Sequence, residues 1–204
     1  MSEVNEKNYL ENGEGFKSWF FTVDHKRIGV MYLWAIAVFF IIAAIASFLV
    51  RFEHLTPGQT IVSADTYNVL FTLHGSMMVF LFIVPGVAAS FGNFLIPLMI
   101  GAKDVIFPKL NLYSFWIYLA GAAIFMIALA GPADTGWTFY TPYSIETGAN
   151  VILITLGIFV LGFSSILTGI NFIVTMHKLR APGMTWDRLC LLYTSPSPRD
   201  RVLS

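Results

Sequence analysis

The chain has 204 residues, of which 56% are hydrophobic and only 12% are charged, and its mean hydropathy is +0.71. Because a typical soluble domain is about one quarter charged, this composition leaves too little polar surface to cover a water-soluble globule. The formal net charge of zero argues against nucleic acid as a partner. The single cysteine, Cys190, excludes a disulfide within the chain and any metal site built from several cysteines.

The first 27 residues are polar at the start and then aromatic and basic. The opening MSEVNEKNYLENGEG lacks the basic start and short apolar core of a signal peptide. The following FKSWFFTVDHKR, residues 16–27, mixes aromatic and basic side chains, as segments that lie in a membrane interface do. We therefore predict that residues 1–27 form a cytoplasmic N-terminal segment with an interfacial lead-in to the first membrane helix.

Four long apolar stretches follow, at about residues 28–50, 67–100, 112–131 and 150–177. Each is long enough to cross about 30 Å of hydrocarbon as a helix. A buried helix of a soluble protein is the alternative for any one stretch, but four in succession argue against it. The sequence thus predicts an all-α integral membrane helical bundle with four transmembrane helices. Pro85, inside the second stretch, is expected to kink its helix.

Basic residues indicate how these helices cross the membrane. Eleven of the twelve lie before the first helix, between the second and third, or after the fourth, and Arg51 is the exception. Since basic residues concentrate in cytoplasmic segments, both termini are predicted to be cytoplasmic. Near Trp186 the composition changes to a Ser-, Pro- and Arg-rich end without helical periodicity. We interpret residues 187–204, which include Cys190, as a non-native artefact tail.

Two ionisable side chains lie at similar depth toward the predicted outer face. His74 lies about two turns into the second helix, where a neutral imidazole suits an axial heme ligand. Gly75 and Ser76 leave room beside it for a flat macrocycle. Arg51 ends the first helix. The residues alone leave alternatives open, because His74 could hydrogen-bond a neighbouring helix and Arg51 could extend to the interface as ordinary arginines do.

A second polar group lies near the predicted cytoplasmic face. It comprises Asp104 in a short loop with the helix residues Asn93, Asn111, Asn171, Ser164, Ser165 and Thr168. Such amides and hydroxyls could order a file of water molecules that starts at the Asp104 carboxylate. Ordinary hydrogen bonding between helices, with a capping aspartate, is the alternative. His25 and His177, beside basic residues at the same face, are predicted to be solvated.

Five segments lie in unbroken order between residues 16 and 186: DHKRIGVMYL, YNVLFTLHGSMMVF, FGNFLIPLMIGAKDVIFPKLN, GPADTGWTFY and SSILTGINFIVTMHKLRAPGMTW. With them the chain resembles the N-terminal third of subunit I of the bacterial heme-copper terminal oxidases. The resemblance implies a twelve-helix family fold, of which this chain carries four helices. It also implies a multi-pass protein of the bacterial plasma membrane that works with a copper A subunit II, a subunit III and cytochrome c.

The resemblance assigns a role to each candidate residue. His74 matches an axial ligand of the low-spin heme, heme a, and Arg51 matches the arginine at the formyl group of that heme. Tyr67 and Trp137 match residues near the heme edge and propionates. Asp104 matches the entrance of a proton channel. Asn93, Asn111 and Asn171 match the asparagine gate of that channel, and Ser164 and Ser165 match serines further along it.

The departures from the family pattern limit what this chain can do. The second axial histidine, the copper B and high-spin heme ligands, the cross-linked tyrosine and the glutamate at the head of the channel all lie beyond Trp186 in the family. The high-spin heme and copper B therefore belong to a part that this sequence lacks. We expect no oxygen reduction from these residues alone, and an inactive four-helix remnant is an alternative.

Two further alternatives concern the class of protein. Quinol-oxidising relatives carry Arg, Asp and His where this chain has Ile42, Ala46 and Thr66, so cytochrome c is the expected donor. A four-helix transporter would show inverted repeats and broken helices near the midplane, and the sequence shows no repeat. A purely structural membrane protein would need neither Asp104 with three asparagines nor His74 with Arg51.

Overall fold

The computed structural model describes residues 15–131, 133–147 and 150–186. Their long helices are α2 (His25–Glu53), α3 (Ala64–Met77), α5 (Pro108–Leu129) and α7 (Val151–Lys178), and α3 continues through η1 (Met78–Ile83) and η2 (Gly86–Phe91) into α4 (Gly92–Ile100). Two short helices, α1 (Phe16–Phe20) and α6 (Tyr143–Glu146), complete the set. Within these residues there is no strand, and four helical spans are long and apolar enough to cross a membrane, which confirms the predicted fold class.

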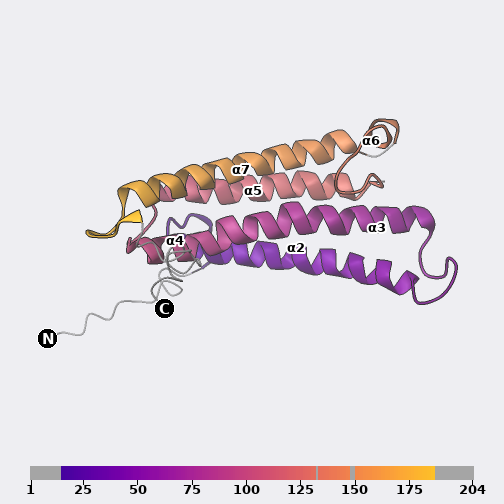
Figure 1. Ribbon diagram of the computed structural model, residues 1–204, viewed down its shortest axis with the longest axis horizontal. Helices are drawn as coiled ribbons and strands as arrows, with labels where there is room; N and C mark the ends of the chain where they lie inside the picture. Colours follow the sequence, from indigo (N-terminus) through magenta and orange to yellow (C-terminus); the bar gives the residue numbers. More distant parts are fainter. Residues whose placement is uncertain (1–14, 132, 148–149, 187–204) are drawn as a thin grey trace, which may run out of the picture.

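The four spans run antiparallel to their chain neighbours and form two packed pairs (Figure 1). One pair is α2 with α3, and the other is α5 with α7. The second pair crosses closely at Gly121 and Gly157, because a Cβ on Gly157 would lie 2.9 Å from the backbone nitrogen of Phe125. Small residues at such crossings let membrane helices approach one another.

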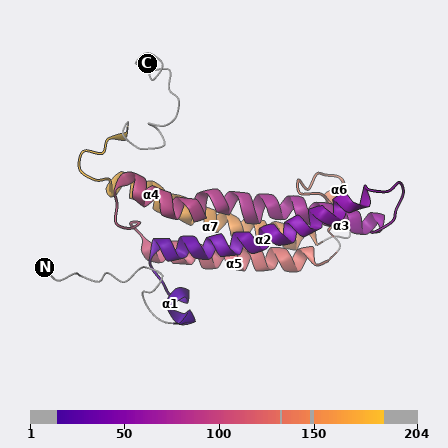
Figure 2. The ribbon, with the colours of Figure 1, turned by 90° about the horizontal axis from the view of Figure 1, so that it is seen from below.

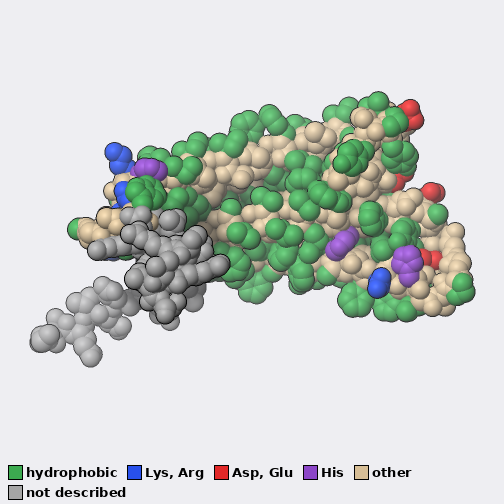
Figure 3. Space-filling model, in the orientation of Figure 1, with side chains coloured by type: hydrophobic (Ala, Val, Ile, Leu, Met, Phe, Trp, Pro, Cys, Tyr) green, Lys and Arg blue, Asp and Glu red, His purple; other side chains and the backbone are tan. Residues whose placement is uncertain are grey.

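The bundle has two chemically different ends. At the first end lie α1, the loop at 101–107 and residues 179–186, and at the second lie the loops at 54–63 and 133–147 (Figures 1 and 2). Figure 3 shows Lys and Arg side chains at the first end, mainly Asp and Glu side chains at the second, where Arg51 also lies, and a hydrophobic surface between them. Exposed side chains such as Ile41, Val87 and Phe163 make this middle surface suited to lipid or to further helices.

The segment before α2 lies against the first end of the bundle. Asp24 caps α2, with its Oδ1 accepting a hydrogen bond from the Lys26 amide at 2.8 Å. The Arg27 guanidinium lies 4.8 Å from the ring centre of Trp19 and donates to the Ser18 carbonyl oxygen. Figure 2 shows α1 beside the bundle rather than within it. Phe16, one of its aromatic side chains, is well exposed. That residues 16–27 lie in the membrane interface remains a proposal.

Pro85 interrupts the second span and creates a polar tie to α5. Proline has no amide hydrogen to bond the carbonyl four residues earlier, which is that of Leu81. The two π-helical turns, η1 and η2, flank this position. The Tyr118 hydroxyl of α5 donates to the Leu81 carbonyl oxygen at 2.8 Å, inside the buried core. The tyrosine therefore satisfies the acceptor that the proline frees.

We predict that Tyr118→Phe lowers the free energy of unfolding by about 1–2 kcal/mol, because it leaves a buried carbonyl unpaired while keeping the ring contacts. Reversible unfolding of the chain in mixed micelles measures this. Tyr113→Phe is the matched control, since Tyr113 lies on the same helix but is 59% exposed. Equal effects of the two substitutions would contradict the proposed tie.

A carboxylate organises the loop at the second end. Asp134 accepts hydrogen bonds from the Tyr143 hydroxyl at 2.5 Å and the Thr147 hydroxyl at 2.9 Å. The bond from Tyr143 is the main reason that the pKa of Asp134 lies below its ordinary value of 3.8. Because the folded pKa is the lower one, the charged form favours the folded loop. That contribution is complete above the unfolded pKa and is lost as the pH falls through the folded pKa.

We therefore predict that the loop at 133–147 loses order only below about pH 4. Amide hydrogen exchange of this loop, compared with that of α5 as the pH is lowered, measures the effect. Asp134→Asn should remove the pH dependence, whereas Glu146→Gln, at an exposed carboxylate of the same loop, should keep it. A pH dependence that survives Asp134→Asn would show that another group controls the loop.

Candidate functional site

The His74 ring is held between the first two spans. Its Nδ1 lies 2.9 Å from the backbone carbonyl oxygen of Ala43 on α2. A carbonyl oxygen can only accept, so Nδ1 carries the hydrogen and Nε2 of the neutral ring keeps its lone pair. Metal-bound histidines commonly use such a bond to fix the orientation of the ring. His74 is half-buried, so the ring is both oriented and accessible.

His74 and Arg51 line one groove between α2 and α3. The groove has a volume of about 280 Å³, and its walls are mostly apolar. Its lining comprises Phe40, Ala44, Ser47, Phe48, Arg51, His74 and Met78. An apolar groove with one free imidazole nitrogen and a guanidinium at its end fits part of a flat, anionic macrocycle such as heme. No group of three or more His, Cys, Asp or Glu side chains elsewhere in the described residues could hold a metal ion.

Tyr67 and Trp137 lie near this groove but do not line it. The Tyr67 hydroxyl lies 2.9 Å from Nε2 of His54 and borders a separate hollow that includes the loop at 55–59. Glu53 organises the following part of this connection by accepting hydrogen bonds from the backbone amides of residues 60–62. Trp137 packs against Gly75, directly after His74 in the sequence. The two aromatic residues therefore lie at the same end of the bundle as Arg51.

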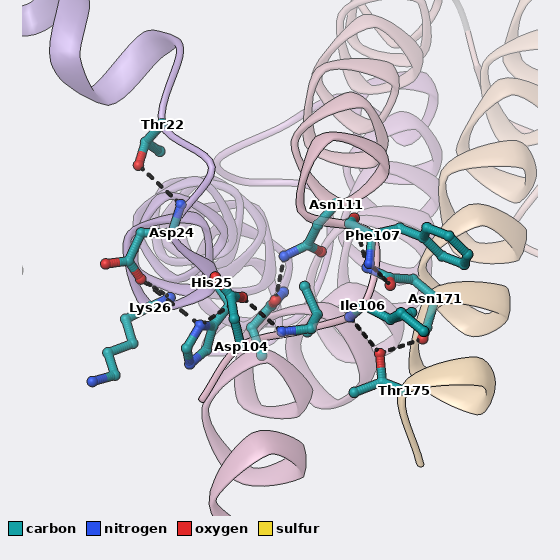
Figure 4. Close-up of polar contacts among 12 residues, drawn as sticks. Thr22, Asp24, His25, Lys26, Asp104, Ile106, Phe107, Asn111, Asn171 and Thr175 are labelled. Carbon is teal, nitrogen blue, oxygen red and sulfur yellow. Dashed lines mark hydrogen bonds and ion pairs between the residues drawn. The ribbon is translucent and has the colours of Figure 1, made fainter. Parts of the chain in front are cut away.

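All three asparagines are fully buried near the first end of the bundle, and Figure 4 shows Asn111 and Asn171 there. Asn111 donates to the Asn93 side-chain oxygen at 2.5 Å, and Asn93 donates to the Ala89 carbonyl oxygen. Asn171 instead accepts from the Phe107 amide at 3.0 Å and donates to the Phe107 carbonyl oxygen at 3.2 Å. The structure thus joins Asn93 to Asn111 directly, whereas Asn171 holds the loop that precedes α5.

Asp104 lies in that loop and contacts α2. Its Oδ1 accepts from the Val105 amide at 2.6 Å and lies 2.9 Å from Nδ1 of His25. His25 is only 4% exposed, so the prediction that it is solvated was wrong. The loop at 101–107 folds over the start of α2 and covers the ring, a tertiary contact that local sequence does not reveal. His177 is exposed, as predicted.

Buried hydroxyl groups continue from the asparagines into the bundle. The Tyr32 hydroxyl lies 3.2 Å from the Ser114 oxygen and 3.3 Å from the Ser164 oxygen. Tyr32 and Ser164 border a cavity of about 290 Å³, which Ser165 and Thr168 also line. Since one water molecule occupies about 30 Å³, the cavity has room for several. Ser165 itself is exposed on the outside of α7.

Two buried oxygen atoms in this region have no hydrogen-bond partner among the described residues: Oδ1 of Asn111 and Oγ1 of Thr168. Buried polar atoms without a protein partner are the positions where internal water binds. Together with the hydroxyls they offer a nearly continuous series of polar groups from α5 to the middle of α7. Such a series can order water molecules that carry a proton.

Sequence reasoning missed three members of this polar series: His25, Tyr32 and Ser114. His25 and Tyr32 are seven residues apart on α2, and Asn111 and Ser114 are three apart on α5, so each pair shares one helix face. This spacing was a usable signal. The sequence did not indicate which face of α2 meets α5, because α2 is apolar on all sides.

Comparisons with known proteins identify relatives of this chain. A family model described as "Cytochrome C and Quinol oxidase polypeptide I" matches residues 27–195. The chain is 42% identical over 173 residues to a cytochrome c oxidase subunit 1 of Thermostichus vulcanus, covering 84% of this chain and 31% of that protein. It is 43% identical over 174 residues to a probable cytochrome c oxidase subunit 1-beta of Nocardia farcinica, covering 82% of this chain and 29% of that protein.

The chain thus spans about a third of the length of the relatives it matches. The match covers the groove at His74, the asparagines and the loop with Asp104, and it extends nine residues beyond Trp186. These residues form four membrane-spanning helices, as the resemblance implied. The chain belongs to the family of cytochrome c and quinol oxidase polypeptide I, the heme-copper oxidases, and is a partial chain of that family.

Proposed function

We propose that this chain is the N-terminal part of the catalytic subunit of a proton-pumping cytochrome c oxidase, which passes electrons from cytochrome c to O₂. The observation that carries the proposal is His74, whose ring is oriented by Ala43 in one groove with Arg51, in a chain of this family. Because the chain covers about a third of its relatives, the activity belongs to the complete subunit.

The groove residues fit the low-spin heme a. His74 would ligate the iron through Nε2, and Arg51 would place its positive charge at the polar edge of the macrocycle. Tyr67 and Trp137 would lie at the outer edge, near the propionates. When bound, the heme supplies a centre that accepts and passes on one electron at a time. The hydrogen bond to the Ala43 carbonyl would fix the orientation of the His74 ring toward the bound iron.

The polar series at the first end supports a proton pathway. Asp104 would take up protons from the cytoplasm, and His25 would hold its carboxylate at the mouth of the pathway. Asn93 and Asn111 would act as a gate that passes protons only through ordered water. Asn171 would fix the loop that carries Asp104. Beyond the gate, Ser164 and Ser165 border the cavity and would order the next water molecules.

Cytochrome c is the electron donor that we favour over a quinol. At the positions of a quinol pocket the chain has Ile42, Ala46 and Thr66, none of which can ionise. Ile42 packs against the apolar core, and Ala46 is 3% exposed. The relatives named above are also cytochrome c oxidases by name. A quinol would lack the polar contacts that orient it here.

The remaining parts of the proposal follow from the family. The complete subunit would hold a high-spin heme and copper B, and it would assemble with subunit II, which carries copper A, and with subunit III. It would lie in the bacterial plasma membrane with both ends of this segment in the cytoplasm. The basic first end of the bundle supports this orientation.

We predict that His74→Ala, made in the complete oxidase, abolishes the absorption band of the low-spin heme. The substitution removes an iron ligand that no neighbouring side chain replaces in the described groove. The optical spectrum of the reduced enzyme is the measurement. His177→Ala is the matched control, since His177 is exposed at the opposite end and should leave the spectrum unchanged. A normal low-spin band in the His74→Ala enzyme would refute the assignment.

We also predict that Asp104→Asn slows proton uptake from the inner side, by as much as the roughly 10²-fold that a positioned proton donor contributes. Proton uptake by the oxidase in lipid vesicles, followed with a pH indicator dye, measures this rate. Asp104→Glu should restore much of it, and Lys103→Gln, at the adjacent exposed residue, should change it little. Uptake at the normal rate in Asp104→Asn would place the entrance elsewhere.

A further inference from the structure

The loop at 133–139 is bound to α3 beside His74. The contact is made by Thr72 and Gly75, which are three residues apart and therefore share one face of the helix. Thr72 bonds the backbone of Gly136, and Gly75 lies under the side chain of the next residue, Trp137. Together they form a clasp, defined here as Thr72, Gly75, Gly136 and Trp137.

The Thr72 hydroxyl is the polar half of the clasp. It donates to the Asn68 carbonyl oxygen at 2.9 Å and accepts from the Gly136 amide at 2.9 Å. Thr72 is fully buried, so water cannot replace either bond. Gly136 has φ +75°, a conformation that favours glycine, and this turn aims its amide at the hydroxyl. The hydroxyl thus bonds a loop and a helix at the same time.

Gly75 is the steric half of the clasp. A Cβ at this position would lie 2.9 Å from Cδ1 of Trp137 and 3.2 Å from its Cβ. The indole therefore rests where any side chain at position 75 would stand. Because Gly75 directly follows His74, the position of the indole relative to the imidazole depends on this missing side chain. The loop is also held by the hydrogen bond at Asp134, which precedes Gly136 in the chain, whereas Trp137 follows it.

We propose that Thr72 and Gly75 are positioning residues that fix Trp137 beside His74. Neither would touch the heme, because Trp137 occupies the space beside Gly75 that was predicted to be left for a macrocycle, and both would act through the loop. The clasp itself stands on the contacts above, and its effect on the heme rests on the function proposed for His74 and Trp137. A loop that shifted would move the indole relative to the heme edge and change the polarity there, which tunes the heme potential.

The first test needs no heme. In the full chain in lipid nanodiscs, Thr72→Val should speed hydrogen exchange at the Gly136 amide roughly two- to tenfold, the effect of losing one hydrogen bond. Thr72→Ser keeps the hydroxyl and should preserve the slow exchange. If Thr72→Val leaves the Gly136 amide as protected as before, the clasp does not exist, whatever the heme does.

The second test addresses Gly75. With fluorine-labelled tryptophan, the resonance of Trp137, assigned by Trp137→Phe, should shift in Gly75→Ala. Gly162→Ala is the matched control, since Gly162 is also helical but a Cβ there meets no atom within 4 Å. Alanine stabilises a helix more than glycine does, so both substitutions should raise helix stability to a similar extent. A difference between the two variants would therefore come from the contact with Trp137. An unmoved Trp137 resonance in Gly75→Ala would refute the steric half.

The third test separates the clasp from the function. In the complete oxidase, Thr72→Val should shift the midpoint potential and the absorption maximum of the low-spin heme, and Thr72→Ser should restore both. The hydrogen exchange and the fluorine resonance could respond while the low-spin heme is unchanged. In that case the clasp holds the loop but does not position Trp137 for the heme, and the proposed positioning role fails. If His74→Ala leaves the low-spin heme intact, the proposed function fails and the clasp remains.

Discussion

Polar groups inside a membrane have no bulk water to bind, so every one of them needs a partner within the protein. This constraint explains most of the specific contacts in the bundle. Pro85 frees the Leu81 carbonyl, and Tyr118 satisfies it. The Asn93 and Asn111 amides bind each other, and the Thr72 hydroxyl bonds a helix and a loop at once. The apolar surfaces hold the helices together, and these bonds decide how they are placed.

The same constraint makes the exceptions informative. The His74 ring uses one nitrogen on Ala43 and keeps the other for a ligand. Oδ1 of Asn111 and Oγ1 of Thr168 have no partner among the described residues, and Thr168 borders a cavity large enough for water. In a membrane such groups are costly unless they serve a function. They lie where we propose that the complete subunit binds heme and conducts protons.

The two candidate sites lie toward opposite ends of the bundle, as the proposed function requires. Electrons from an outer donor would reach the groove at His74 and Arg51, whereas protons would enter beside Asp104 at the basic end. Electrons from the outer side and protons from the inner side together move charge across the membrane potential. Each elementary charge moved in this way stores about 2.3 kcal/mol per 100 mV. The loops at 101–107 and 133–139 matter here because they hold Asp104 and Trp137 in place at the two ends.

Much of the fold was predictable from sequence because membrane helices are long and apolar. Apolar length alone marked the four helices, and the quoted motifs marked the family. The pairing of side chains was harder to foresee, since it depends on which helix faces meet. Asn171 binds the Phe107 backbone rather than the other asparagines, His25 is buried by a loop, and Tyr32 reaches Ser114 and Ser164 from a helix that is apolar all round. Local patterns do not encode such contacts between distant segments.

The central claim is that this chain is the N-terminal part of a cytochrome c oxidase catalytic subunit. Its most direct test is to sequence the source DNA from codon 180 onward. The account predicts that the reading frame continues into further hydrophobic helices that carry a His-x-x-x-Tyr motif and a His-His pair, which would complete the heme and copper sites. A genomic stop codon directly after Ser204 would contradict it. In that case the groove at His74 and the polar series at Asp104 would record the ancestry of the chain rather than an activity.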